Sequence, residues 1–127
     1  MRVIIAGSRT INSYEEVEKA IEDSGFVIDE VVSGGARGVD KLGEVWARDH
    51  DIPIKVFPAD WAEYGKAAGI IRNGQMSRYA DALIAVWDGS SRGTTDMICK
   101  AHHEGLRVHV RTVTTSKETY RGSRRPA

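Results

Sequence analysis

The sequence contains a single cysteine, Cys99, so no disulfide bond can form within the chain. The four histidines, at positions 50, 102, 103 and 109, do not combine with this cysteine in the spacing of a zinc site, and they suggest no pairing of a nucleophile with a base. We therefore expect no metal site and a reducing, intracellular environment. We also expect that no cofactor is required.

Net charge and long apolar runs are missing as well. The 18 Lys and Arg residues balance 18 Asp and Glu residues, so the chain has no overall field that would attract nucleic acid or an anionic membrane. No apolar stretch approaches the length that crosses a membrane, and the run at residues 2–6 is too short for a signal peptide. The sequence thus predicts a cytoplasmic protein with no membrane partner, in which any anion site is local.

What the sequence does contain is a regular alternation of short apolar runs and amphipathic segments, over a length typical of one domain. The apolar runs predict buried strands at residues 2–6, 27–32, 52–57, 80–86 and 107–110. Helical spacing predicts helices between residues 12 and 25 and at 38–50, 67–79 and 97–104, with a loop or short helical turn at 58–66.

This alternation predicts the fold class and the domain organisation. Strands joined by helices form right-handed crossovers, so we expect an α/β fold with a doubly wound parallel sheet of about five strands and helices on both faces. Residues 1–112 are predicted to form this domain. Residues 113–127, which carry a local excess of Lys and Arg, are predicted to form a mobile basic tail.

Glycine-rich turns follow the first, second and fourth predicted strands, at residues 7–9, 33–40 and 87–96. In a parallel sheet these turns lie at the carboxyl edge, where ligands bind. Backbone N–H groups in such turns, together with the positive end of a following helix, bind anions such as phosphate. The convergence of three such turns predicts a site for a phosphate-bearing ligand.

Each turn also has a structural interpretation. Gly7 is explained equally well by a tight turn. The segment 33–38 is neither a dinucleotide fingerprint nor a Walker A loop; its glycines favour cradling of a phosphate or ribose, and the alternative is close packing of a helix on the sheet. Asp40 is either a carboxylate favoured by the helix dipole or an acceptor for ribose hydroxyls. Arg72 is ordinarily a solvated arginine, and Met76 and Trp87 are expected in the core or in a pocket wall.

Four motifs carry a resemblance to a known superfamily. They are Gly-Ser-Arg at 7–9, Ser-Gly-Gly-Ala-Arg-Gly-Val-Asp at 33–40, Arg-Asn-Gly-Gln-Met at 72–76, and the strand at 80–86 with the following Asp-Gly-Ser-Ser-Arg-Gly-Thr at 88–94. In order and spacing, over about residues 1–110, they resemble the SLOG superfamily, and within it the small YspA/YpsA-related proteins of bacteria and phages. The resemblance implies a Rossmann-like fold that binds nucleotides or derivatives such as ADP-ribose or NAD-like molecules.

The enzymes of this superfamily include LOG-type phosphoribohydrolases, which cleave the N-glycosidic bond of a nucleoside monophosphate. Their Arg-Lys-x-x-Met motif is matched by Arg72 and Met76, with Asn73 in place of lysine. Residues 90–94 stand where their Pro-Gly-Gly-x-Gly-Thr-x-x-Glu loop would be, and Met97 replaces its glutamate. A thioether can neither accept a proton nor stabilise an oxocarbenium-like charge, so the family's cleavage mechanism is not expected to operate unchanged.

The leading hypothesis is a sensor or sequestering domain for a nucleoside monophosphate, ADP-ribose or an NAD-like molecule. The candidate ligand-binding residues are Gly7, Ser8, Arg9, Ser33, Gly34, Gly35, Arg37, Gly38, Asp40, Arg72, Asn73, Asp88, Ser90, Ser91, Arg92, Gly93 and Thr94. The alternative is a nucleotide N-glycosidase with Arg72 on the phosphate and Asp96 or Asp88 as the acidic group. A third hypothesis, DprA-like binding of nucleic acid, is disfavoured by the zero net charge. The resemblance is also compatible with a homodimer or higher homo-oligomer.

Overall fold

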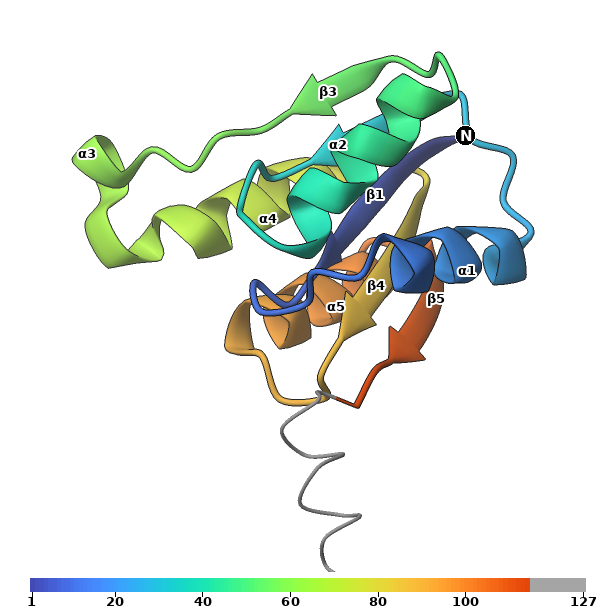
Figure 1. The fold of residues 1–127 in the computed structure, drawn as a ribbon. Coiled ribbons are helices and arrows are strands. Elements are labelled where there is room, and N and C mark those ends of the chain that lie inside the picture. The colour runs from blue at the N-terminus through green and yellow to red at the C-terminus, as the bar shows by residue number, and fades with distance from the viewer. Residues whose placement is uncertain (115–127) are drawn as a thin grey trace, which may run out of the picture.

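A computed structural model describes residues 1–114 of the chain as a five-stranded, all-parallel sheet covered by helices on both faces (Figure 1). The strands are β1 Arg2–Gly7, β2 Glu30–Ser33, β3 Ile54–Val56, β4 Ala82–Trp87 and β5 Arg107–Thr112. Their order in the sheet is β3-β2-β1-β4-β5. The predicted α/β class and doubly wound parallel sheet are confirmed. Most of the predicted tail, residues 115–127, lies outside the described residues.

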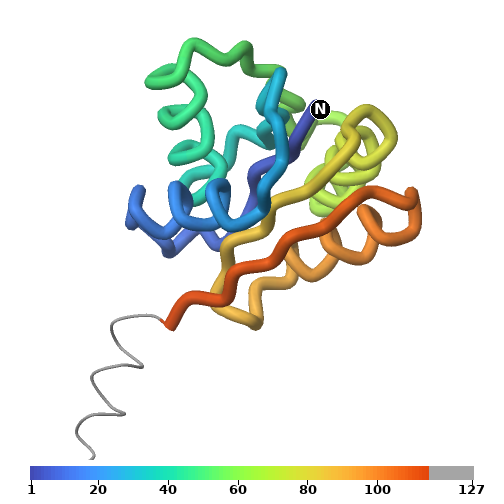
Figure 2. The backbone as a smooth tube through the Cα atoms, turned by 90° about the vertical axis from the view of Figure 1, so that its right-hand side faces the viewer, coloured from blue at the N-terminus to red at the C-terminus, as the bar shows by residue number. Residues whose placement is uncertain are grey.

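The helices divide between the two faces of the sheet, as the edge-on view in Figure 2 shows. Their bounds are α1 Tyr14–Ser24, α2 Val39–Asp49, α3 Trp61–Tyr64, the 3-10 turn η1 Gly65–Ala67, α4 Ala68–Tyr79 and α5 Arg92–His103. Helices α1 and α2 pack on one face, and α4 and α5 pack on the other. None of the helices within residues 1–114 has both the length and the apolar character needed to cross a bilayer.

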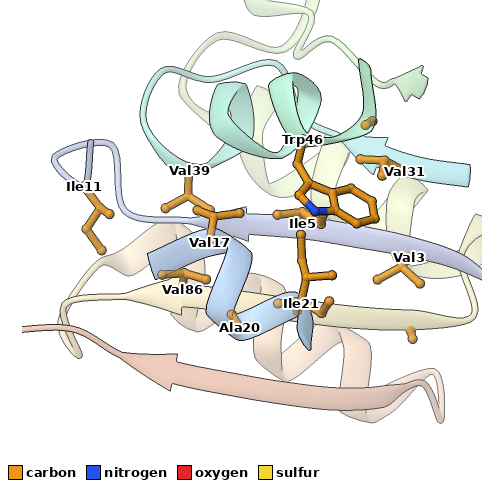
Figure 3. Packing of buried hydrophobic residues seen from close by; sticks show 13 residues of the cluster. Val3, Ile5, Ile11, Val17, Ala20, Ile21, Val31, Val39, Trp46 and Val86 are labelled. Atoms are coloured by element: carbon orange, nitrogen blue, oxygen red, sulfur yellow. The ribbon is translucent and has the colours of Figure 1, made fainter. Parts of the chain in front are cut away.

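The core consists of two apolar layers separated by the sheet. Successive side chains of a strand point to opposite faces, so Val3 and Ile5 of β1 face α1 and α2, whereas Ile4 faces α4 and α5. Figure 3 shows Trp46 of α2 and Val17 of α1 lying over Ile5. Burial on both sides explains why β1 and β4 are continuous apolar runs rather than alternating ones.

The largest error in the predicted elements concerns α5, which begins at Arg92 rather than at residue 97. Gly93, Thr94 and Thr95 have low helix propensity and therefore indicated a loop. In the structure Ser91 is the extended residue that precedes the helix, and the Thr95 amide already donates to Ser91 O over 3.0 Å. Strands β2 and β3 are shorter than predicted, and the segment 58–66 contains α3 and part of η1.

The strand order places a reversal between β1 and β4, at the centre of the sheet. From β1 the chain moves outward to β2 and β3, and it then returns to the opposite side of β1 to form β4 and β5. The loops after β1 and β4 consequently diverge to opposite faces beyond the carboxyl ends of adjacent strands. In doubly wound sheets a crevice opens at this point.

Candidate functional site

A cleft of about 330 Å³ opens at this reversal, beyond the carboxyl ends of β1 and β4. The loops that follow β1, β2 and β4 contribute to it, together with α4 and the first turns of α2 and α5. The residues that line it are Ala6, Gly7, Ser8, Arg9, Thr10, Ala36, Asp40, Arg72, Asn73, Met76, Asp88, Ser91, Gly93, Thr94 and Met97. The three predicted glycine-rich turns therefore meet in one cleft.

The loop after β1 is fixed against the end of β4 by the backbone and side chain of Ser8. Ser8 donates its amide to Val86 O over 3.1 Å, and its hydroxyl oxygen accepts the Asp88 amide over 3.0 Å. A Cβ built on Gly7 would lie 1.7 Å from Val86 O, a distance that no side chain tolerates. This close approach of two strands accounts for glycine at position 7, independently of any ligand.

The loop after β2 packs closely against the loop after β1. Gly38 has φ +82°, and a Cβ on it would lie 2.5 Å from Ser8 O and 2.6 Å from the Cα of Arg9. The adjacent Val39 amide donates to Ser8 O over 3.3 Å. Only glycine combines this backbone conformation with such close contact, so Gly38 serves to join the two loops.

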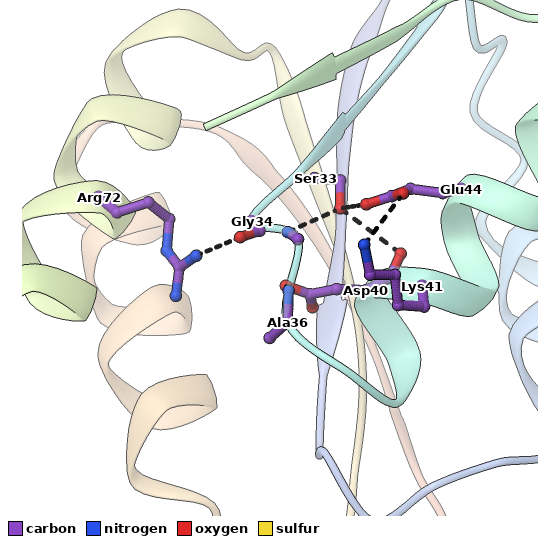
Figure 4. A network of polar contacts seen from close by, with 8 residues as sticks. Ser33, Gly34, Ala36, Asp40, Lys41, Glu44 and Arg72 are labelled. Carbon is purple, nitrogen blue, oxygen red and sulfur yellow. Dashed lines mark hydrogen bonds and ion pairs between the residues drawn. The ribbon is translucent and has the colours of Figure 1, made fainter. Parts of the chain in front are cut away.

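Polar side chains behind this loop form the network shown in Figure 4. The Ser33 hydroxyl donates to Glu44 Oε2 over 2.6 Å and accepts the Gly35 amide over 3.1 Å. Glu44 is almost completely buried, and Lys41 Nζ lies 3.7 Å from its Oε1. The network satisfies a buried carboxylate and sets the path of the glycine loop.

Asp40, in the first turn of α2, is the buried carboxylate that faces the cleft. Its exposed fraction is 6%, and its Oδ2 accepts the Ala36 amide over 3.2 Å. Burial raises the pKa of Asp40 to about 6, although the Ala36 amide and the charge of Arg72 both act to lower it. This carboxyl therefore changes protonation close to neutral pH, as groups at functional sites often do.

Arg72, on α4, reaches across the cleft to the loop after β2. Its Nη1 donates to Gly34 O over 2.5 Å, and its Nε donates to Asn73 Oδ1 over 3.1 Å. Burial lowers the pKa of Arg72, Asp40 opposes this effect, and the neighbouring charge of Arg9 adds to it. Two guanidinium groups that repel each other beside an open cleft are favourably placed to share an anion.

Asn73, which replaces the lysine of the hydrolases, connects α4 to α5. Its Nδ2 donates to Gly93 O over 3.2 Å and to Asp96 Oδ2 over 3.0 Å. Met76 and Met97 line the same cleft, are almost completely buried and form its apolar floor. The position of the hydrolases' glutamate is thus occupied by a core side chain.

The first turn of α5 provides backbone donors. Asp88 Oδ1 accepts the amides of Ser90 over 2.9 Å and Ser91 over 3.0 Å, and the Ser90 amide is the main cause that lowers the pKa of Asp88. Thr95 is the first residue of α5 whose amide reaches a carbonyl one turn earlier. The amides at residues 92–94 have no acceptor within residues 1–114, and such orphan donors at a helix N-terminus attract anions.

The structure does not bring every predicted residue to the cleft. Gly34 and Gly35 line a neighbouring pocket, which shares Arg9 and Arg72 with the cleft. Ser33 and Gly38 are buried behind the glycine loop. The exposed residues Arg37, Ser90 and Arg92 do not line the cleft, and neither does Asp96, whose Oδ1 binds Lys100 Nζ over 2.6 Å.

Several residues that surround the site were not predicted from the sequence. Ala6, Thr10 and Ala36 line the cleft, and Lys41 and Trp61 line the neighbouring pocket. Thr10 could have been inferred from its place beside Arg9, whereas Trp61 lies in a segment with no clear periodicity. Within residues 1–114 no group of three or more His, Cys, Asp or Glu side chains is arranged to hold a metal ion.

Comparison with known proteins agrees with this architecture. The model of the YspA, cpYpsA-related SLOG family matches residues 1–64. The Gene 61 protein of Mycobacterium phage D29 is 35% identical over 119 residues, which cover 84% of this chain and 93% of that protein.

The X-ray structure of DNA processing protein A (DprA) from Streptococcus pneumoniae superimposes with a TM-score of 0.72. The match has 17% sequence identity and covers 97% of this chain but 54% of that chain, so this chain spans about half the length of its structural neighbour. At this identity the likeness shows the fold alone.

Proposed function

The chain belongs to the YspA, cpYpsA-related SLOG family, and we propose that it binds a nucleotide or nucleotide-derived ligand in the cleft between the loops after β1 and β4. The candidate ligands are a nucleoside monophosphate, ADP-ribose or an NAD-like molecule. In this proposal the protein acts as a sensor of the ligand or sequesters it.

One observation carries the proposal: donors suited to phosphate and an acceptor suited to ribose line the same cleft. Arg9, Arg72 and the first turn of α5 offer cationic and backbone donors. Asp40, when ionised, can accept hydrogen bonds from sugar hydroxyls. The apolar floor of Met76 and Met97 suits the carbon face of the sugar.

The proposal is tested by calorimetric titration with AMP, ADP-ribose and NAD. We expect at least one of them to bind below millimolar concentration, and Arg72→Ala to weaken it about tenfold or more, because an arginine–phosphate contact is lost. Arg78→Ala is the matched control, since Arg78 lies on the same helix and does not line the cleft. Absence of binding by all three, or salt-sensitive retention of DNA in place of nucleotide binding, would contradict the proposal.

A specific observation also favours a second function, hydrolysis of an N-glycosidic bond. Asp40 and Asp88 line the same cleft, and their pKa values shift in opposite directions. Such a pair can divide the work, with one protonated carboxyl on the leaving base and one carboxylate that activates water or stabilises the developing positive charge. Water would be consumed, and free base and ribose 5-phosphate would be released from a nucleoside monophosphate. Asp96, the other acidic group predicted from the sequence, has no catalytic role in this proposal, because its carboxylate lies outside the cleft.

This second function is tested by chromatographic detection of free base from a panel of nucleoside monophosphates. We expect release by the wild type and its loss in both Asp40→Asn and Asp88→Asn, with nucleotide binding retained in at least one of them. If the wild type releases no base, or if both variants retain full activity, the protein is a binding domain only.

A further inference from the structure

A second pocket, of about 310 Å³, adjoins the cleft. Arg9, Ala36 and Arg72 line both, so the two spaces lie on either side of these three residues. The second pocket extends from there toward the end of β3 and the start of α3, where it is lined by Val56, Pro58 and Trp61. Together the two spaces have the size range of a pocket for a small organic ligand.

The second pocket differs from the cleft in charge. Three cationic side chains, Arg9, Lys41 and Arg72, line it, and among residues 1–114 no Asp or Glu does. The cleft, by contrast, contains the two carboxylates of Asp40 and Asp88. The second pocket therefore combines a positive wall next to the cleft with an apolar wall farther from it.

Trp61 is the main feature of the apolar wall. Its exposed fraction is 54%, although tryptophan is highly buried on average. The turn that carries it is fixed, because the Asp60 carboxylate accepts the Glu63 amide over 3.0 Å. A Cβ built on Gly69 would lie 3.8 Å from Trp61 Cη2 and 3.8 Å from Arg72 Nη2, so the indole and the guanidinium flank the same glycine.

We propose that the second pocket holds the aromatic base of the bound nucleotide, stacked on Trp61, while the phosphate and sugar occupy the cleft. This inference rests on the proposed nucleotide binding and adds the position of the base. An exposed indole face is a stacking surface that accepts any base, and neighbouring cations add to the attraction. No aromatic side chain among residues 1–114 lines the cleft itself, so Trp61 is the aromatic surface within reach of a nucleotide bound there. The ligand class is accordingly one that carries a base, and simple sugar phosphates are poor ligands.

The test compares ligands with and without a base on wild type and Trp61→Ala. The probes are AMP and ADP-ribose, which contain adenine, and ribose 5-phosphate, which lacks it. We expect Trp61→Ala to weaken binding of the two adenine ligands about five- to 150-fold, the range for removal of a base-stacking aromatic, and to leave the affinity for ribose 5-phosphate within about twofold. Trp61→Phe, which keeps an aromatic face, should retain most of the affinity.

Tyr64→Ala is the matched control, because Tyr64 is an exposed aromatic of the same short helix that lines neither space. Adenine ligands should also quench tryptophan fluorescence in the wild type, and this quenching should be lost in Trp61→Phe. If Trp61→Ala binds the adenine ligands normally, or loses affinity for all three probes equally, the position of the base is wrong while nucleotide binding stands. If the wild type binds none of the probes, both proposals fail.

Discussion

The guanidinium of Arg72 donates a hydrogen bond of 2.5 Å to the carbonyl oxygen of Gly34, across 38 positions of the sequence. This contact joins α4 to the loop after β2, and Asn73 extends the connection to α5 through Gly93 O. Two adjacent side chains of one helix therefore hold the loop after β2 and the first turn of α5. Because these contacts form without a ligand, ligand binding requires little further ordering of the loops.

Gly34→Ala should weaken both folding and nucleotide binding, because it displaces Arg72. The added Cβ would lie 2.5 Å from Arg72 Nη1 and 2.9 Å from Asp40 Oδ2, and the guanidinium, as the end of a flexible side chain, would move away. We expect a loss of about 1–2 kcal/mol in the free energy of unfolding and about tenfold weaker nucleotide binding. Gly74→Ala, on α4 outside the cleft, is the control for titration and denaturation. Unchanged affinity in Gly34→Ala would show that the position of Arg72 is not critical.

Asp40→Asn should make stability less dependent on pH. Because burial raises the folded-state pKa of Asp40 from 3.8 to about 6, the folded protein binds more protons than the unfolded chain between these values. The stabilising contribution of this group is therefore fully present below about pH 4 and is lost as the pH rises through 6, by up to about 3 kcal/mol. Asparagine resembles the protonated form, so the variant should be the more stable protein at pH 7.5 and nearly equal to wild type at pH 4.

Urea denaturation of both proteins at pH 4, 6 and 7.5 measures this difference. A difference between the two that stays constant over this range would mean that the pKa of Asp40 is not raised. The same substitution should weaken nucleotide binding at pH 7.5, because a neutral amide is a poorer acceptor for sugar hydroxyls than a carboxylate. Higher stability with lower affinity is typical of a residue retained for function.

Gly93→Ala should likewise raise stability and lower affinity. Gly93 lies in the first turn of α5, and a Cβ there would meet no atom within 4 Å. Alanine should stabilise the helix by up to about 1 kcal/mol, seen as a melting temperature a few degrees higher. Because Gly93 lines the cleft, the methyl group would obstruct the approach of a phosphate to the helix terminus. Calorimetry should show about tenfold weaker binding, and unchanged affinity would place the phosphate elsewhere.

Ser33→Ala should destabilise the glycine loop. It removes the 2.6 Å hydrogen bond to the buried Glu44 carboxylate and the acceptor of the Gly35 amide. The cost should be about 1–3 kcal/mol in the free energy of unfolding, since a buried charged group loses a partner. The exposed Ser90→Ala is the control and should change stability by about 0.5 kcal/mol or less. If the double variant Ser33→Ala/Glu44→Gln costs as much as the sum of the two single changes, the two residues are not coupled.

The fold class could be predicted from the sequence because the patterns of strands and helices are visible in short stretches of residues. Continuous apolar runs predicted β1 and β4, and their burial on both faces is the physical reason for that pattern. The start of α5 was predicted wrongly, because Gly93 and two threonines have low helix propensity and lie in its first turn. There, Asp88 Oδ1 fixes the amide of Ser91, the residue before the helix, and this contact and the packing of Met97 on the sheet outweigh intrinsic propensity.

The sequence by itself determined that glycine turns follow three parallel strands and hence share one edge of the sheet, because strand direction and crossover hand leave no other arrangement. Only the tertiary structure decided which side chains of those turns face the cleft. Asp40 and Arg72 enter it, whereas Asp96 turns to Lys100 and Arg37 to solvent. Glycine at positions 7 and 38 reflects the close approach of segments distant in sequence, since a Cβ at either position would lie less than 3 Å from the neighbouring segment. Such distances, and the burial that raises the pKa of Asp40, exist only once the chain has folded.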